Sequence, residues 1–531
     1  MAFFSCKPEL KLDSDFDIPQ KKALSTSNDV ENALQTAYAV LRSKDNFGGA
    51  WMIWPELMAD QMIYNPLSPV LAPELSIYNR NLQPNDSLIN NSWKNAYASI
   101  SICNSIIRVC EEGKISDGDF ERNKPRFVGE AKFLRALTYF HLVRFFGPQY
   151  DESTKNTLAI PMPIQYYDEL KNEPIVSVST VYEQILADFR SSIQNLNQAG
   201  RIQNRTTEEE FSLGGGLPVF NRPTVHIARG FLAKTYAQMD SKLYANEIIE
   251  EINNIIEDRA DKPRPEDSLD LTQHGPPDRT ERYFPQPYPI FGIERSRLDG
   301  MFSSNFGLGT ALTYDNGYEA LFSIMNFGNF IDGLNSFNYI SRRFTYIPGS
   351  PDFREIVPFV PIDTIERVFV SRRLDKRFST FFAQSSPRIS VNGKDRFILV
   401  KYQGNYSNIT LLRSADLLLL RAEARIQLGQ LRKSIYDLGF VIWRSSTDIR
   451  INSTISRLYE QAGAGNSAFF MNSIVSERRK EFYMEGDRLH TLRRLKLQIP
   501  ASERGPAIPW TAPELIFPIP TSETSTNINL K

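Results

Sequence analysis

Apolar residues recur every three to four positions in the first and last parts of the chain, and this period predicts amphipathic α-helices. Val30, Leu34 and Leu41 form one such stripe, and Asn28-x-x-Glu31 predicts that the helix begins near Asn28. The same period predicts helices over residues 88–109, 127–146, 181–196, 223–239, 244–256, 416–428, 431–443 and 469–495. The pattern therefore predicts a mainly α fold.

Capping and stop signals define several of these helices more closely. Thr180-x-x-Glu183 is a capping-box pattern that predicts the start of the 181–196 helix, and Pro223 suits a first turn. Gly147-Pro148 predicts the end of the 127–146 helix. Helices of this length in antiparallel pairs are typical of tetratricopeptide-like hairpins.

The helical period fails in the middle of the chain, where proline, glycine and aromatic residues are concentrated. Phe and Tyr between residues 283 and 346 are well above their frequency in the whole chain, which argues against disorder. These rings either anchor an irregular lobe to the helices or present exposed platforms for a flat ligand such as a sugar ring. We expect a tether over residues 1–20, a helical scaffold over 21–258, an aromatic-rich lobe over 259–404 and a C-terminal helical part over 405–531.

Composition and charge argue against several classes of protein. Lys and Arg total 61 against 62 Asp and Glu, so the chain lacks the basic excess of a nucleic-acid-binding protein. Hydrophobic residues make up 41% of the chain, which is typical of a globular protein. The sequence contains no apolar run long enough for a membrane-spanning helix.

The three cysteines do not form a disulfide framework. Cys103 and Cys110 lie two turns apart on one predicted helix, too far for a bridge, and we expect both to be buried. Cys6 follows a short apolar start and resembles the first mature residue of a lipoprotein, although five residues are shorter than a signal peptide. Either the signal is truncated or this likeness is accidental. Asp13, Asp15 and Asp17 suit a solvated acidic tether.

Enzyme and cofactor motifs are not found in the sequence. It contains no G-x-S-x-G elbow, no H-E-x-x-H, no P-loop and no G-x-G-x-x-G, and the four histidines are scattered. We therefore expect no enzyme activity, no cofactor and no metal. A pair of carboxylates for glycoside hydrolysis remains open, because its spacing in space cannot be derived from sequence.

A series of ordered motifs makes the chain resemble the SusD/RagB family. The most diagnostic is the segment GEAKFLRALTYFHLVRFFGP at residues 129–148. It is followed in order by AIPMP (159–163), TVYEQILAD (180–188), residues 222–236, DKR (375–377), LLRSADLLLLRAEA (411–424), ERRKEFYMEGDR (477–488), LRR (492–494) and IFPIP (516–520). The family usually has proline in the middle of DKR, and relatives usually extend slightly beyond the present C-terminus.

The resemblance implies both a fold and a role. Family members are SusD-like helical proteins that capture nutrients at the outside of the outer membrane and deliver them to a SusC-like TonB-dependent transporter. It implies that Cys6 carries a lipid, that this lipid is the chain's contact with the membrane, and that the ligand is an oligosaccharide. A peptide ligand, a glycan hydrolase and a pure scaffold remain alternatives.

The resemblance also places the ligand surface, in the loop after the first helix and in the mid-chain lobe. Sugar recognition needs aromatic faces and planar polar groups, which both segments supply. The expected ligand residues are Tyr64, Asn65, Tyr78, Asn79, Arg80, Tyr288, Arg295, Tyr314, Asn316 and Tyr318. Trp51, Trp54 and Trp93 are expected in the core.

The charged residues of the 477–488 motif are expected to be structural. Glu477, Arg478, Glu481, Glu485 and Arg488 fall at spacings that allow them to pair along one helix.

Overall fold

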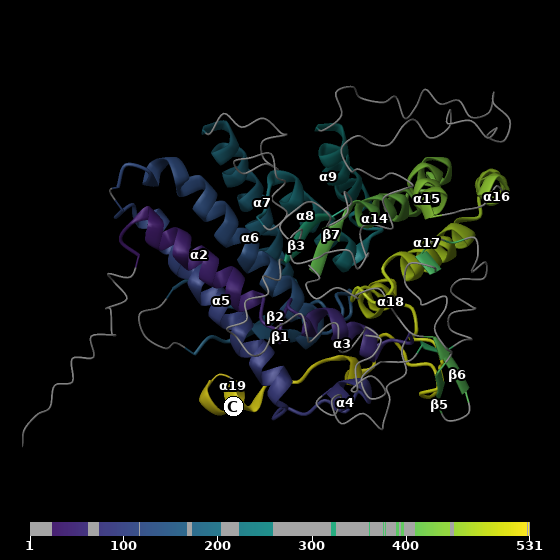
Figure 1. Cartoon of the computed structure of the whole chain (residues 1–531), viewed down its shortest axis with the longest axis horizontal. Coiled ribbons are helices and arrows are strands. Elements are labelled where there is room, and N and C mark those ends of the chain that lie inside the picture. Colours follow the sequence, from purple (N-terminus) through teal and green to yellow (C-terminus); the bar gives the residue numbers. More distant parts are fainter. Residues whose placement is uncertain are drawn as a thin grey trace, which may run out of the picture.

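The computed structural model describes most of the helical parts of the chain (Figure 1). The described residues are 24–61, 74–115, 117–166, 172–202, 222–258, 320–324, 360–361, 375, 377–378, 389–391, 394–397, 409–445, 451–527 and 529. The helices before the mid-chain lobe are α2 (Ser27–Leu41), α3 (Ala50–Met58), α4 (Leu75–Tyr78), α5 (Ser87–Glu112), α6 (Phe120–Phe146), α7 (Val178–Ile202), α8 (Val225–Asp240) and α9 (Ala245–Asp258). After it come α14 (Ser414–Gln427), α15 (Leu431–Ser445), α16 (Ile451–Gly463), α17 (Ser467–Glu481), α18 (Arg488–Arg494), the short 3-10 helix η4 (Pro513–Leu515) and α19 (Thr521–Thr526).

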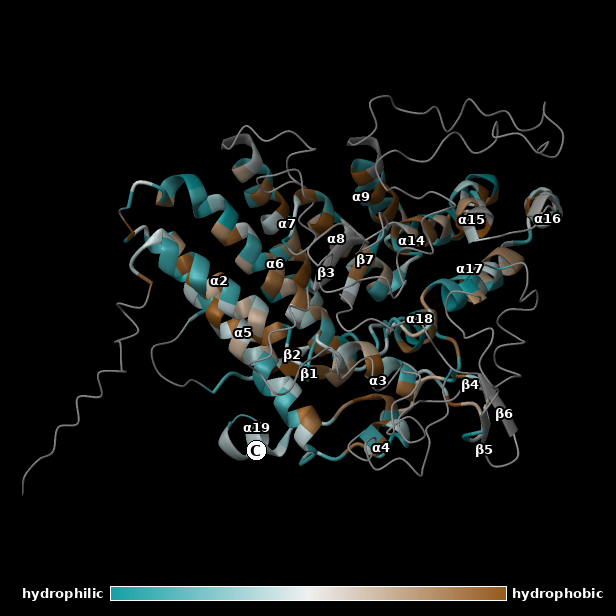
Figure 2. Cartoon of the chain, viewed as in Figure 1, coloured by the Kyte–Doolittle hydropathy of each residue, from teal (hydrophilic) through white to brown (hydrophobic). Residues whose placement is uncertain are grey.

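Consecutive long helices pack side by side as an array, which confirms the mainly α prediction. Helix α5 packs against α6, α6 against α7, α7 against α8 and α8 against α9. The array continues from α9 to α14 and α15, although the lobe separates them in the sequence (Figure 1). Hydrophobic and hydrophilic residues alternate along α2, α5 and α7 (Figure 2), as packing of one helix face requires.

Local signals fix the helix ends, and two of the predicted caps are wrong. Helix α2 is capped by Thr26 in a capping box with Asp29, two residues earlier than the predicted Asn28 and Glu31. Helix α7 begins at Val178, so Thr180 lies inside its first turn and does not cap it. In both cases a nearby residue can also cap the helix, and the sequence pattern does not show which candidate does so.

Helix α6 is the centre of the scaffold. It begins at Phe120, seven residues before the predicted start, and ends at Gly147 as predicted. Tyr139 and Leu142 on it are fully buried, and Trp54 and Trp93 are buried as expected, with Trp51 also at 3% exposure. The free cysteines Cys103 and Cys110 are both buried, which confirms that prediction.

The predicted single helix over 469–495 is two helices, α17 and α18. The chain breaks between them because Met484 and Gly486 have φ values of 60° and 79°, which a right-handed helix does not allow. The five charged residues that were expected to pair with one another along one helix have other partners, such as Lys480 for Glu477. Glu481 binds Arg377 and Arg413, and Arg488 binds Asp60.

The described strands are short and antiparallel. β1 (Leu158–Pro161) pairs with β2 (Ile175–Ser177) between α6 and α7. β3 (Ala320–Ile324) pairs with β7 (Ile409–Arg413), which leads directly into α14. β6 (Lys394–Phe397) lies between β4 (Val360–Pro361) and β5 (Ile389–Val391). Most of the expected 259–404 lobe lies outside the described residues.

The C-terminal segment packs onto the first helices. The Phe517 N–H donates to the Phe145 carbonyl over 2.8 Å, and the Phe517 ring stacks on Trp54 at 5.1 Å between centroids. The Trp93 indole N–H donates to the Glu523 carboxylate over 3.3 Å. The two ends of the described chain therefore share one core. Among the described helices, none combines the length and apolar character of a membrane span.

Candidate ligand surface beside helix α4

The structure describes three of the ten residues expected to contact ligand. Tyr78 ends helix α4, and Asn79 and Arg80 follow it in the turn (Figure 1). Asn79 is exposed, whereas Tyr78 and Arg80 are half-buried. The expected ligand residues outside the described part are Tyr64, Asn65, Tyr288, Arg295, Tyr314, Asn316 and Tyr318, and Cys6 lies outside it as well.

Arg504 covers one face of the Tyr78 ring. The guanidinium carbon lies 3.9 Å from the ring centroid, within the range of a cation–π contact. The same guanidinium donates from Nη2 to the Tyr78 carbonyl. Arg504 belongs to a hairpin in which Ile499 pairs with Ile508. Sequence reasoning missed Arg504, because it lies 426 residues from Tyr78 and belongs to none of the motifs.

Arg80 and Arg504 together hold the C-terminal end of helix α3. Arg80 donates from Nε and Nη2 to the Met58 carbonyl over 2.9 and 2.6 Å. Arg504 donates from Nη1 to the carbonyls of Leu57 and Ala59 over 2.5 and 2.9 Å. The last carbonyls of a helix lack intrahelical donors and carry partial negative charge, so two guanidinium groups suit this position.

Burial and mutual repulsion make this cationic pair unusual. Burial, with the nearby charge of Arg80, lowers the pKa of Arg504 to about 10. Burial also lowers the pKa of Arg80, against the opposing effect of Glu514. Arg80 has a φ of 56°, so its backbone is held in the left-handed region by these contacts. The expectation that Arg80 binds sugar hydroxyls remains a prediction, now for a side chain that also holds helix α3.

Both ends of the segment 62–73, which contains Tyr64 and Asn65, are fixed to the scaffold. Just before it, Asp60 binds Arg488 over 2.9 Å and Arg479 over 3.0 Å. These two charges keep the pKa of Asp60 below its usual value although burial opposes them. Just after it, Glu74 is buried at the start of α4. The described residues on both sides of this segment are therefore buried in the scaffold.

A cavity lies elsewhere in the scaffold, where α3, α6, α8, β7 and α18 meet. Its volume is about 90 Å³. Pockets that enclose drug-sized ligands have volumes of roughly 300–1,000 Å³, so this cavity cannot enclose an oligosaccharide. Among the described residues, no cluster of three or more His, Cys, Asp or Glu side chains could hold a metal ion. The surface beside α4 stays our candidate for a large ligand because Tyr78, Asn79 and Arg80 lie there.

Comparison with known proteins identifies the family. Residues 12–209 match a SusD-like family described as starch-binding and associating with the outer membrane, and residues 390–531 match the SusD family, SusD_RagB. Together these segments take in most of the chain, including Tyr78, Arg80 and Arg504.

Curated relatives match over shorter segments. A SusD-like protein of Bacteroides ovatus is 25% identical over 154 residues, which is 28% of this chain and 22% of the relative. SusD-like protein P2 of Formosa agariphila is 27% identical over 168 residues, 31% of this chain and 30% of the relative. The matches thus span less than a third of either relative's length.

Solved structures share the fold over nearly the whole chain. A SusD superfamily protein of Bacteroides thetaiotaomicron has a TM-score of 0.70 at 18% identity, covering 95% of this chain and 99% of that one. A SusD-like carbohydrate binding protein of Bacteroides vulgatus has a TM-score of 0.65 at 15% identity, covering 95% and 97%. These likenesses show the fold, and the ordered motifs and family matches agree with it. The chain belongs to the SusD/RagB family.

Proposed function

We propose that the protein is a surface-exposed lipoprotein that binds oligosaccharides and delivers them to a SusC-like TonB-dependent transporter in the outer membrane. The observation that carries the proposal is the match of residues 12–209 to a family described as starch-binding and associating with the outer membrane. That segment contains both Tyr78 and the end of α3, which Arg504 connects by hydrogen bonds. The description of a structural neighbour as a carbohydrate binding protein supports the same class of ligand.

The chemistry of the α4 turn suits a sugar ring. Arg504 holds the Tyr78 ring by a cation–π contact, and we place the contact with the C–H side of a sugar on this ring. Asn79 is exposed beside the ring and can offer both a donor and an acceptor to hydroxyl groups. A ring held in advance loses little conformational freedom on binding, which favours affinity.

A glycan array tests the ligand class. The purified protein should bind a restricted set of oligosaccharides saturably. Incubation of the best ligand with the protein should leave its chain length unchanged by chromatography, because the proposed role is capture without catalysis. Release of shorter products would favour the hydrolase, saturable binding of peptides alone would favour a peptide-binding member, and no saturable ligand would favour a scaffold.

Membrane attachment is proposed through Cys6, with residues up to about 20 as the acidic tether. In protein expressed with a complete signal peptide, Cys6→Ala should move the protein from the membrane fraction to the soluble fraction. The buried Cys110 supplies a control, since Cys110→Ala should leave the protein in the membrane fraction. If Cys6→Ala remains with membranes in cells that lack the transporter, the lipid-anchor proposal is wrong.

A further inference from the structure

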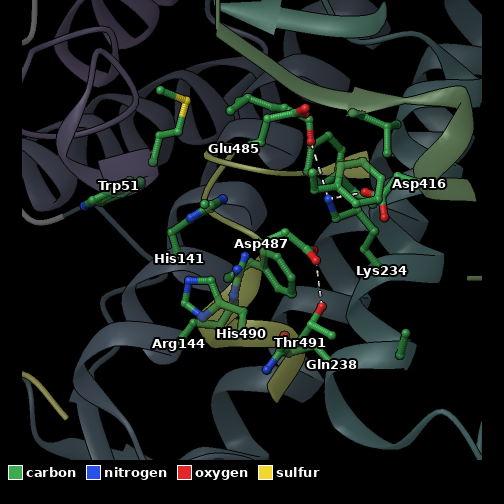
Figure 3. A pocket seen from close by; sticks show the side chains of 18 of the residues that line it. Trp51, His141, Arg144, Lys234, Gln238, Asp416, Glu485, Asp487, His490 and Thr491 are labelled. Carbon is green, nitrogen blue, oxygen red and sulfur yellow. Dashed lines mark hydrogen bonds and ion pairs between the residues drawn. The ribbon is translucent and has the colours of Figure 1, made fainter. Parts of the chain in front are cut away.

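The cavity between α3, α6, α8, β7 and α18 combines aromatic walls with an unusual density of charge (Figure 3). Phe47, Trp51 and Phe140 form part of its wall. The cationic residues that line it are Arg144, Lys234, Arg413, Arg478 and Arg494. Figure 3 shows His141, His490 and Arg144 close together on one side, with Lys234 and Asp416 on the other.

Four of these five cations have carboxylate partners. Lys234 Nζ lies 2.5 Å from Asp416, and Arg478 Nη2 lies 2.9 Å from Asp416 and 2.5 Å from Asp487. The other two paired cations are Arg413, 3.0 Å from Glu485, and Arg494, 2.5 Å from Glu423. The three carboxylates that line the cavity, Asp416, Glu485 and Asp487, are thus all occupied by these pairs.

Arg144 differs from the other four. Within the part of the chain that the structure describes, its side chain has no ion pair and no hydrogen bond, and its Nε is buried without a partner. Its one described contact is with the face of Phe140, 4.6 Å from the ring centroid, which leaves the N–H edge of the guanidinium unused. Arg144 is half-buried, and its Nε lies in the buried part, where a polar atom without a hydrogen bond is costly, so the guanidinium is suited to bind an anion there.

Two imidazoles beside Arg144 also present unpartnered nitrogens. His141 Nδ1 and His490 Nε2 are buried without a hydrogen-bond partner, and His490 is only 3% exposed. Trp51 holds the His141 ring by stacking at 5.0 Å with an interplanar angle of 6°. Phe145 contacts the His490 ring edge-on at 5.3 Å. Both imidazoles are therefore fixed in orientation, like preorganised donors.

Charge in the cavity favours an anion over a cation. Burial lowers the pKa of Arg144 to about 10, and Arg493 adds to this effect while Asp487 and Asp416 oppose it. Burial and the charge of Arg144 hold the pKa of both imidazoles well below 6.5. Neutral imidazoles can each donate one N–H, and a guanidinium edge binds oxyanions in a planar, two-point geometry.

We propose that this cavity binds a small anion, of the size of acetate or phosphate, between the guanidinium of Arg144 and the imidazoles of His141 and His490. The volume of about 90 Å³ sets the upper limit on its size. The bound anion would connect α6 with α18, segments separated by more than 340 residues in the sequence, as the hydrogen bond from Arg493 to the Arg144 carbonyl does. The site is separate from the proposed glycan surface beside α4.

Melting temperatures in sodium acetate, sodium phosphate and sodium gluconate, matched in ionic strength, test the site. Gluconate is the matched control, because it carries the same carboxylate on a body too large for the cavity. Acetate or phosphate should raise the melting temperature of the wild type with a saturable concentration dependence, since a ligand of the native state stabilises it. Arg144→Met should abolish this rise. Arg190→Met, which removes an exposed arginine beside Tyr236 and away from the cavity, should retain it.

Equal melting temperatures of the wild type in all three salts would overturn the proposal, as would an equal rise in Arg144→Met. If Arg144→Met does not fold, crystals of the wild type soaked in sodium bromide decide the question. An anomalous peak in contact with Arg144 and His490 supports the site. A map without bromide there overturns it.

Discussion

Glu56 is a carboxylate without an ion pair among the described residues, fully buried in helix α3. Its Oε1 accepts the Gly486 N–H over 2.8 Å, and its Oε2 accepts the Gln61 side-chain amide over 2.7 Å. Burial raises its pKa from 4.5 to about 7, although both hydrogen bonds oppose the shift. The Glu56 side chain therefore joins α3 to the break between α17 and α18. It is protonated at low pH, whereas at high pH it becomes a buried anion that destabilises the native state.

Glu56→Gln should change how stability depends on pH. An acid whose pKa is raised on folding binds a proton more tightly in the native state, so the native state loses stability as pH rises from about 4.5 through 7. This difference in pKa between the unfolded and the native state corresponds to about 3 kcal/mol in the free energy of unfolding. Urea unfolding at pH 4 and pH 8 should thus show Glu56→Gln gaining about this much relative to the wild type at the higher pH. If the difference in unfolding free energy between Glu56→Gln and the wild type is the same at both pH values, the raised pKa of Glu56 is contradicted.

Single residues show what the sequence can and cannot predict about the site. The tryptophans and cysteines expected in the core are buried, because large apolar side chains on a helical stripe have few other places to lie. The partners of Tyr78 and Arg80 could not be predicted. Arg504 reaches Tyr78 from a hairpin near the C-terminus, and Arg80 donates to the carbonyl of Met58. Contacts between distant segments depend on the whole fold, which local patterns do not describe.

At the scale of elements, one of the two left-handed residues in the break between α17 and α18 has to be glycine. Gly486 has a φ of 79°, and a Cβ added there would lie 3.0 Å from both the Cα and the carbonyl oxygen of Met52. These are backbone atoms of helix α3, so they cannot move aside cheaply. Glycine is required here both for its conformation and for the close approach of α3.

Gly486→Ala should therefore destabilise the protein more than an alanine at another left-handed glycine. Gly113, which caps α5 with a φ of 63°, has nothing within 4 Å of an added Cβ. Gly113→Ala should cost about 1 kcal/mol for the backbone conformation alone. Gly486→Ala should cost about 1–3 kcal/mol more, because it also forces α3 to shift. Denaturant unfolding of both variants measures the difference, and equal losses would show that the contact with α3 is unimportant.

The elements themselves were predictable where one periodic stripe dominates. Helices α5, α8, α9, α14 and α15 occur where the apolar period placed them, and α6 ends there but begins seven residues earlier. The error at residues 469–495 has a physical cause: the apolar period continues through Phe482 and Leu489, whereas Met484 and Gly486 adopt left-handed conformations that periodicity does not encode. Helix α3 was missed because its nine residues are all buried and show no polar face.

At the scale of the whole molecule, buried ion pairs connect the first and last thirds of the chain. Asp60 in the first part of the chain binds Arg488 over 2.9 and 3.2 Å and Arg479 over 3.0 Å, both in the last part. Arg377 from the mid-chain lobe binds both Glu477 and Glu481 on α17. Such pairs fix how distant segments meet.

Asp60→Asn should destabilise the protein by about 3–5 kcal/mol, because it leaves Arg488 buried without its countercharge. An exposed pair supplies the control. Glu152, with 81% of its side chain exposed, binds Lys155 over 2.7 Å, and Glu152→Gln should cost less than about 1 kcal/mol. Guanidinium chloride unfolding of the two variants tests the contrast. A loss below 1 kcal/mol for Asp60→Asn would show that this pair does not hold the segments together.

The measurement that tests the central claim most directly is calorimetric titration of the best array ligand into Tyr78→Ala. We predict that binding weakens by about 1–3 kcal/mol, the scale of stacking on an aromatic ring, with little change in melting temperature. Tyr166→Ala is the matched control, since Arg108 lies 4.2 Å above that ring in another part of the scaffold, and it should bind like the wild type. Wild-type affinity in Tyr78→Ala would contradict the placement of the ligand surface beside α4.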